Sequence, residues 1–254
     1  MKATFRYILI TAARDRLFVL LAAGLIVIAS IASLLGGTAI TEPLPMAVSF
    51  FGGAARLWLS LGFIVFISFH VRRLYDTREI DLMLTKPLSR AALIAAFYAG
   101  FLTLALLLLL PVAFLMVLLK VPSVPGFFWW MLSLALELAI VVALATSTAI
   151  ILRSAVASAL GAFGFYVLSR MVGYFLGSAD AIHPRPEEWI TMLAKYGLKI
   201  LSTVMPRLDF FAQTEWLVYG LQDSSAPLHF ALQAAIYAPL LYAAAVYDTH
   251  RKQF

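Results

Sequence analysis

Six long runs of apolar residues, almost free of charge, constrain this chain more than any other feature of its sequence. About 20 helical residues cross the roughly 30 Å hydrocarbon core of a bilayer, and a helix satisfies its own backbone there. With 63% hydrophobic and 13% charged residues, the 254-residue chain cannot cover a water-soluble surface. We therefore predict an all-α polytopic membrane protein, with one transmembrane domain over residues 1–254. Its six spans are expected at about 17–35, 54–71, 91–119, 128–152, 155–176 and 230–247.

The distribution of lysine and arginine predicts which side of the membrane holds the termini. An even number of spans places both termini on one side. Twelve lysines and arginines fall on that side and six on the other, where four lie in the long segment 177–228 and count for less. We therefore expect both termini in the cytoplasm. The first apolar run is longer than that of a signal peptide and has no convincing cleavage site after it, so we expect it to be retained.

Residues 1–16 combine an apolar stripe with four cations. Phe5, Ile8 and Ala12 recur at helical spacing, whereas the basic residues lie between and after them. This pattern predicts an interfacial helix on the cytoplasmic leaflet. The alternative is a frayed basic leader.

The loop between the second and third spans carries a pattern typical of a short surface helix. Asp76 can cap its beginning, Glu79 suits its first turn, and Pro87 ends it. Apolar side chains flanked by charges form a surface that a cytoplasmic protein can bind. The alternative is a solvated loop whose arginines only set orientation. The residues expected to couple to a partner are Asp76, Arg78, Glu79, Ile80, Asp81, Met83, Leu84 and Lys86.

The segment Glu79-Ile80-Asp81-Leu82-Met83-Leu84-Thr85-Lys86-Pro87-Leu88-Ser89-Arg90 resembles the acidic, leucine-rich segment that precedes the third span in ABC-2 type transporter permeases. The stretch from Phe5-Arg6 to Arg14-Asp15-Arg16-Leu17 is similar to the first helix of that family, and the six-span layout also resembles it. The resemblance implies that residues 76–86 are a coupling helix that docks on a separate nucleotide-binding ATPase subunit. It further implies an exporter in the bacterial cytoplasmic (inner) membrane, with two ATPase copies and a homodimer of permease chains.

The chain itself offers no site for nucleotide chemistry. No G-x-x-x-x-G-K-[ST] sequence occurs, so we expect ATP and Mg²⁺ to bind to the partner subunit and the chain to be neither an enzyme nor a cofactor-binding protein. Four scattered histidines and the absence of cysteine indicate no metal site, and each histidine is expected in a loop or at an interface. No basic stripe interleaved with aromatic residues indicates nucleic-acid binding. Small residues at 155–162 allow close helix contacts, either within the chain or between two copies.

The resemblance also implies a central cavity lined by spans one, two and five. Aromatic walls would suit an amphipathic or lipid-like substrate, although the same side chains also fill ordinary contacts between helices. The candidate wall residues are Phe63, Phe66, Phe163 and Tyr166.

Residues 184–220 are expected to form short outer helices between the fifth and sixth spans. From Glu188 to Val204, polar and apolar residues alternate at helical spacing, which predicts a half-embedded helix. The following residues 208–219 are rich in aromatic side chains suited to the headgroup level, namely Phe210, Phe211, Trp216 and Tyr219. Such helices either cap the exit of a translocation path or form a lid that only seals a dimer.

Glu137 and Arg170 are the acidic and basic residues that lie well inside the predicted spans, whereas Arg56 is expected to snorkel at the start of the second span. A charge at the bilayer centre costs about 2.5 to 3.5 kcal/mol, and pairing offsets part of that cost. Counted from the outer ends of adjacent antiparallel spans, the depths of the two residues match within about 4 Å. We therefore predict an intramembrane ion pair between them.

Three interpretations of this pair remain open, namely a structural clamp, part of a polar translocation path, and a proton-coupling carboxylate. Two functions other than an ATP-driven transporter also remain open. One is a proton-coupled secondary carrier that uses Glu137. The other is a non-transporting membrane scaffold for a cytoplasmic protein.

Overall fold

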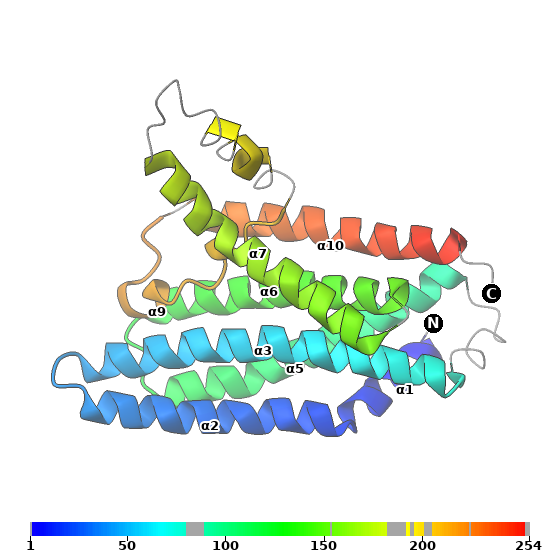
Figure 1. Ribbon diagram of the computed structural model, residues 1–254. Coiled ribbons are helices and arrows are strands. Elements are labelled where there is room, and N and C mark those ends of the chain that lie inside the picture. The colour runs from blue at the N-terminus through cyan, green and yellow to red at the C-terminus, as the bar shows by residue number, and fades with distance from the viewer. Residues whose placement is uncertain are drawn as a thin grey trace.

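Six helices long and apolar enough to cross a bilayer form a bundle in the computed structural model of this chain (Figure 1). The structure describes residues 2–79, 89–152, 154–181, 192–193, 196–200, 205–223 and 225–251, and these ranges contain helices and no strand. The predicted all-α membrane fold is therefore confirmed. The six helices are α2 (Arg16–Thr38), α3 (Pro43–Asp76), α5 (Arg90–Leu118), α6 (Val124–Ile151), α7 (Ala155–Ala181) and α10 (Ala226–Arg251). Of these, α7 crosses its neighbours obliquely (Figure 1).

Short polar residues between the apolar runs cap the first turns of several of these helices. Asp15 accepts a hydrogen bond from the backbone N–H of Leu17 at the start of α2. Ser89 and Ser123 do the same for the first turns of α5 and α6. Each cap satisfies a backbone donor that the helix leaves unpaired. The apolar runs therefore determine where the helices lie, and the capping residues determine where they start.

The third helix is longer than its apolar run. It begins at Pro43 and ends at Asp76, about 51 Å at 1.5 Å per residue, whereas the sequence predicts 54–71. Proline suits the first turn of a helix, which explains the earlier start. Asp76, the residue predicted to cap the next helix, is the last residue of α3, where it pairs with Arg72 at 2.8 Å. The ends of the other five helices agree with prediction within about five residues.

The amino-terminal residues form a helix, α1 (Lys2–Ala13), that packs against α5. Ile8 and Ala12, both on the predicted apolar stripe, are fully buried. A Cβ atom at Gly100 of α5 would lie 2.9 Å from the Ile8 side chain, so this glycine makes the close approach possible. The apolar stripe therefore packs against a neighbouring helix. The alternative prediction, that these residues form a frayed leader, is wrong.

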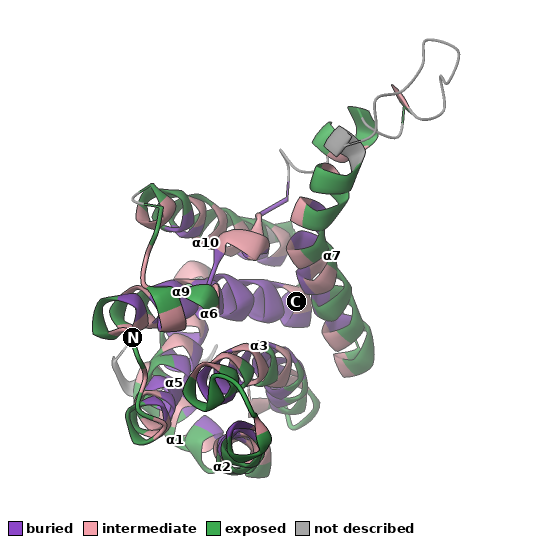
Figure 2. Cartoon of the chain, turned by 90° about the vertical axis from the view of Figure 1, so that its left-hand side faces the viewer, coloured by how far each residue is buried: buried purple, intermediate pink, exposed green. Residues whose placement is uncertain are grey.

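The helix α6 lies at the centre of the bundle, where Figure 2 shows most of it in the colour of buried residues, and it contacts α3, α5, α7 and α10. In the most apolar 18-residue stretch of α6, 72% of the residues are buried, whereas the corresponding fractions are 22% for α2 and 17% for α10. Both termini lie at the same end of the bundle, here called the termini end (Figure 1). The opposite end is called the far end.

At the far end, residues 205–223 fold back against the bundle. They contain a short 3-10 helix, η1 (Leu208–Phe210), and α9 (Glu215–Tyr219), which contact α3, α6 and α7. Phe211 and Trp216 are buried among these helices, while Tyr219 is exposed. Their place at the headgroup level stays a prediction. The predicted outer helix at 188–204 lies mostly outside the described residues. We call residues 205–223 the far-end segment.

The close approach of α6 and α9 predicts a severe effect of Gly126→Ala. An added Cβ would lie 1.7 Å from the backbone oxygen of Trp216, which cannot rotate away as a side chain could. We expect a loss of about 1 to 3 kcal/mol in stability, measured by thermal unfolding in detergent with tryptophan fluorescence as the readout. Gly164→Ala in α7 is the control, since no heavy atom lies within 4 Å of its added Cβ. Equal melting temperatures for both variants would contradict this packing.

Candidate functional site

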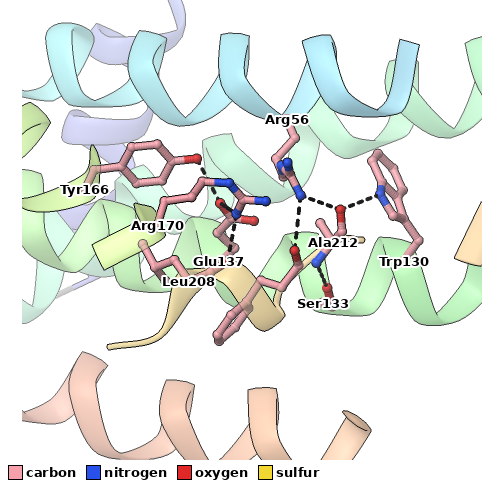
Figure 3. A network of polar contacts seen from close by, with 9 residues as sticks. Arg56, Trp130, Ser133, Glu137, Tyr166, Arg170, Leu208 and Ala212 are labelled. Carbon is pink, nitrogen blue, oxygen red and sulfur yellow. Dashed lines mark hydrogen bonds and ion pairs between the residues drawn. The ribbon is translucent and has the colours of Figure 1, made fainter. Parts of the chain in front are cut away.

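The predicted ion pair between Glu137 of α6 and Arg170 of α7 is present in the structure (Figure 3). Nη1 of Arg170 lies 3.4 Å from Oε1 of Glu137, and the Tyr166 hydroxyl donates a hydrogen bond of 2.9 Å to the same oxygen. Glu137 is fully buried. The carboxylate therefore faces a cation and a hydroxyl donor inside the bundle, which offsets the desolvation of its charge.

Arg170 also holds the far-end segment. Its Nη1 donates a hydrogen bond of 2.7 Å to the backbone oxygen of Leu208, a shorter contact than the one to Glu137. One guanidinium group thus joins α6, α7 and η1. The ion pair is therefore also an anchor for the polypeptide that closes the far end.

A second arginine, Arg56 of α3, binds the same segment. Its Nη1 donates to the backbone oxygens of Phe211 and Ala212, and the indole N–H of Trp130 also donates to the Ala212 oxygen, at 3.2 Å. The Ala212 N–H donates to the hydroxyl of Ser133 (Figure 3). Ala212 has a φ of 44°, in the left-handed region that is unfavourable for residues other than glycine. The three surrounding side chains hold it in this conformation.

The sequence prediction for Arg56 is wrong. Because α3 begins at Pro43, Arg56 lies thirteen residues inside the helix instead of snorkelling at its start. The signal that could have located it is the run Glu42-Pro43-Leu44-Pro45, since prolines mark the first turn of a helix. The site thus contains two arginines and one glutamate. We call these three residues, together with Tyr166, Ser133 and Trp130, the far-end network.

The geometry of the far-end network favours a fixed clamp. Two guanidinium groups and one carboxylate leave one positive charge in excess, and three backbone carbonyl oxygens face that excess. Buried cations need such oxygen acceptors, because no water solvates them in the hydrocarbon region. The arrangement joins three spans to the far-end segment, and among the described residues no cluster of histidine, aspartate and glutamate could hold a metal ion.

A second polar cluster lies at the termini end. The Asp15 carboxylate lies 3.2 Å from Nδ1 of His70 and 3.3 Å from Nη1 of Arg73. Burial raises the pKa of Asp15, but hydrogen bonds from Leu17 and His70 and the charge of Arg73 outweigh it, so the pKa lies below its ordinary value. His70 is buried and lies in α3, six residues before its end, so it is not in a loop.

Three of the predicted coupling residues, Asp76, Arg78 and Glu79, lie at this same end. Asp76 ends α3, and Arg78 has a φ of 56°, which turns the chain out of the helix. The hydroxyl of Tyr7 donates a hydrogen bond to Glu79, which joins α1 to the start of the predicted coupling segment. This hydrogen bond raises the pKa of Tyr7. The other predicted coupling residues, Ile80, Asp81, Met83, Leu84 and Lys86, lie outside the described residues.

The four predicted cavity-wall residues have different surroundings in the part of the chain that the structure describes. Phe63 and Tyr166 are buried in contacts within the bundle, whereas Phe163 is exposed on α7. Phe66 packs edge-on against Phe63 at 6.1 Å between ring centroids, and its ring borders a cleft between α2 and α3. Phe63 and Tyr166 thus fill contacts between helices, and a cavity lined by all four residues stays a prediction.

Comparison with known proteins adds no family to this geometry. No protein-family model matches the chain, and no curated protein matches it. The chain is an integral membrane protein with six candidate spans among its described residues. Its function must therefore be inferred from the helix layout, the two polar clusters and the sequence of residues 79–90.

The far-end network predicts that losing one charge is worse than losing two. Arg170→Met leaves Glu137 buried without its cation, and we expect a loss of about 3 to 5 kcal/mol in stability. The double variant Glu137→Leu/Arg170→Met removes both charges and should be more stable than Arg170→Met alone. Unfolding in detergent, followed by tryptophan fluorescence for the wild type, both single variants and the double variant, measures the coupling. Additive losses would contradict an ion pair.

The cluster at the termini end predicts a pH-dependent effect of Asp15→Asn. Asparagine keeps the cap on α2 but removes the charge that faces His70 and Arg73. Because the folded-state pKa is lowered, the charge stabilises the fold above the ordinary value of 3.8, and the contribution is lost as pH falls through the lowered pKa. The variant should therefore melt below the wild type at neutral pH, and the difference should shrink in acid. A difference that stays constant across this range would contradict the assignment.

Proposed function

We propose that this chain is the membrane subunit of an ATP-driven transporter of the ABC-2 type, exporting an amphipathic or lipid-like substrate. ATP hydrolysis takes place in two copies of a separate nucleotide-binding subunit. The observation that carries the proposal is the sequence of residues 79–90, which resembles the coupling segment of that family. Its first residue, Glu79, follows α3 at the termini end and is hydrogen-bonded to Tyr7 of α1.

The charge distribution supports the orientation that this function needs. The termini end carries most of the lysines and arginines, so the positive-inside rule places it in the cytoplasm. A cytoplasmic ATPase can then reach the segment after Asp76. The far end, with its clamped segment, faces the opposite side of the membrane.

The contacts at the termini end suggest how force on the coupling segment reaches the membrane. Glu79 accepts a hydrogen bond from Tyr7 of α1, and Arg73 forms an ion pair with Asp15, which lies between α1 and α2. Closure of the ATPase subunits on the coupling segment therefore acts on α1, α2 and α3 together. Their displacement changes the access of a substrate path that lies between two permease chains.

The exposed face of α7 supports a second copy of the chain. Ser158 and Ala162 are buried within this chain, where Ser158 bonds to Ser68 of α3. In contrast, Ala157 and Gly161 are exposed one turn apart, so a neighbouring helix could approach closely there. The predicted small residues therefore divide between contacts inside the chain and a face available for a homodimer.

The far-end network gives less support to a proton-coupled carrier. Glu137 is held by Arg170 and Tyr166, beneath the far-end segment that Arg56 and Arg170 anchor. A carrier would transport its substrate in liposomes under a pH gradient without ATP. The ABC-2 proposal expects no transport under that condition.

Copurification from native membranes tests the proposal. We expect a subunit with a Walker A sequence to copurify with the wild-type chain, and Ile80→Asp or Leu84→Asp to abolish that association, since a buried aspartate opposes docking. Ser89→Asp is the control, because it adds the same charge at a position where aspartate can also cap α5. Vesicles containing the purified complex should accumulate substrate only with ATP. A wild-type chain that purifies without a nucleotide-binding subunit would overturn the proposal.

A further inference from the structure

A cleft of about 600 Å³ lies between α2 and α3 on the outside of the bundle. Every residue that lines it is apolar, from Leu17 to Ile28 on α2 and from Ala54 to Phe66 on α3. Leu20 and Val65, which line it, are exposed, so the cleft opens on the surface that faces lipid. An occupant must therefore be apolar along this length.

Two glycines shape the walls of the cleft. The Trp58 indole lies directly over Gly24, where an added Cβ would come within 2.4 Å of the ring. Leu21 lies over Gly62 in the same way, at 2.0 Å. The indole N–H of Trp58 donates a hydrogen bond of 3.0 Å to the Leu21 backbone oxygen, which satisfies its only polar atom. Trp58 therefore forms part of the cleft wall in a fixed orientation, and its fluorescence can report what fills the cleft.

The length of the cleft corresponds to one leaflet of a bilayer. Residues 17–28 of α2 cover about 16 Å, and residues 54–66 of α3 cover about 18 Å. Half of a hydrocarbon core of about 30 Å is about 15 Å. The cleft begins one residue after α2 itself begins, at the termini end. This depth suits an acyl chain that lies parallel to the helices in the leaflet at the termini end.

The rim of the cleft is basic. Arg16 is exposed and lies one helical turn from Leu20, on the same face of α2. On α3, Arg73 lies eight residues beyond Val65, about 12 Å further along the helix toward the termini end. The acidic residue between them, Asp15, already contacts both His70 and Arg73. Positive charge therefore remains where the headgroup of a lipid in the cleft would lie.

We propose that this cleft binds a phospholipid with an anionic headgroup, its acyl chain along Trp58 and its phosphate at Arg16. The combination of an apolar, leaflet-deep cleft and a cationic rim distinguishes this occupant from a zwitterionic lipid. The site needs neither the ATPase subunit nor a second permease chain, so it stands independently of the proposed function.

Quenching of Trp58 by brominated acyl chains tests the site. The purified chain is reconstituted in phosphatidylcholine vesicles that contain a minor fraction of either brominated phosphatidylglycerol or brominated phosphatidylcholine. The contribution of Trp58 is the difference between the wild type and Trp58→Phe. We expect stronger quenching by the anionic lipid, with a preference of about fivefold for each arginine near the headgroup.

Two pairs of variants separate a site from general attraction to the surface. Arg16→Gln should reduce the preference about fivefold, whereas Arg251→Gln should not, since α10 lies across the bundle from α2 (Figure 2). Val65→Phe should fill the cleft and abolish the excess quenching, whereas Val19→Phe, exposed on α2 and not part of the cleft lining, should preserve it. Melting temperatures verify that the variants fold. Equal quenching by both lipids, or equal effects of the two arginine variants, would overturn the proposal.

Discussion

A guanidinium group inside a hydrocarbon layer needs oxygen atoms around it, and two such groups determine how the far end of this bundle is built. Arg56 and Arg170 project from α3 and α7, and between them they bind the Glu137 carboxylate and three backbone carbonyl groups. Those carbonyls belong to polypeptide between the fifth and sixth spans. The need to satisfy the arginines therefore draws this segment into the bundle, where Phe211 and Leu217 become buried.

One helix takes part in both polar clusters. Arg56, thirteen residues inside α3, binds the far-end segment, and His70 and Arg73 near the end of α3 bind Asp15. Fourteen residues separate Arg56 from His70, about 21 Å along the helix. Between them α3 packs against α2, α6 and α7, so the helix joins both clusters to most of the bundle. The structure thus connects the loop after α3 with the closure of the far end through one continuous element.

The sequence predicts the fold well because it depends on local composition. Long apolar runs predict the six helices, and matched depths predict the pair of Glu137 with Arg170. Contacts between distant residues were not predictable in this way. Arg56 and Ala212 are far apart in sequence, and nothing in the local pattern near residue 212 indicates that its carbonyl accepts from an arginine. Asp15 and His70 were missed for the same reason.

The left-handed backbone of Ala212 has a consequence for how the far end can change shape. Arg56 and Trp130 donate hydrogen bonds to the carbonyl of this residue, and Ser133 accepts one from its N–H. The left-handed conformation therefore depends on all three side chains staying in place. If α3 moved away from α6, Arg56 and Trp130 could no longer reach the same oxygen. The released residue would then relax to an ordinary conformation, and the far-end segment would switch between two discrete shapes instead of yielding gradually.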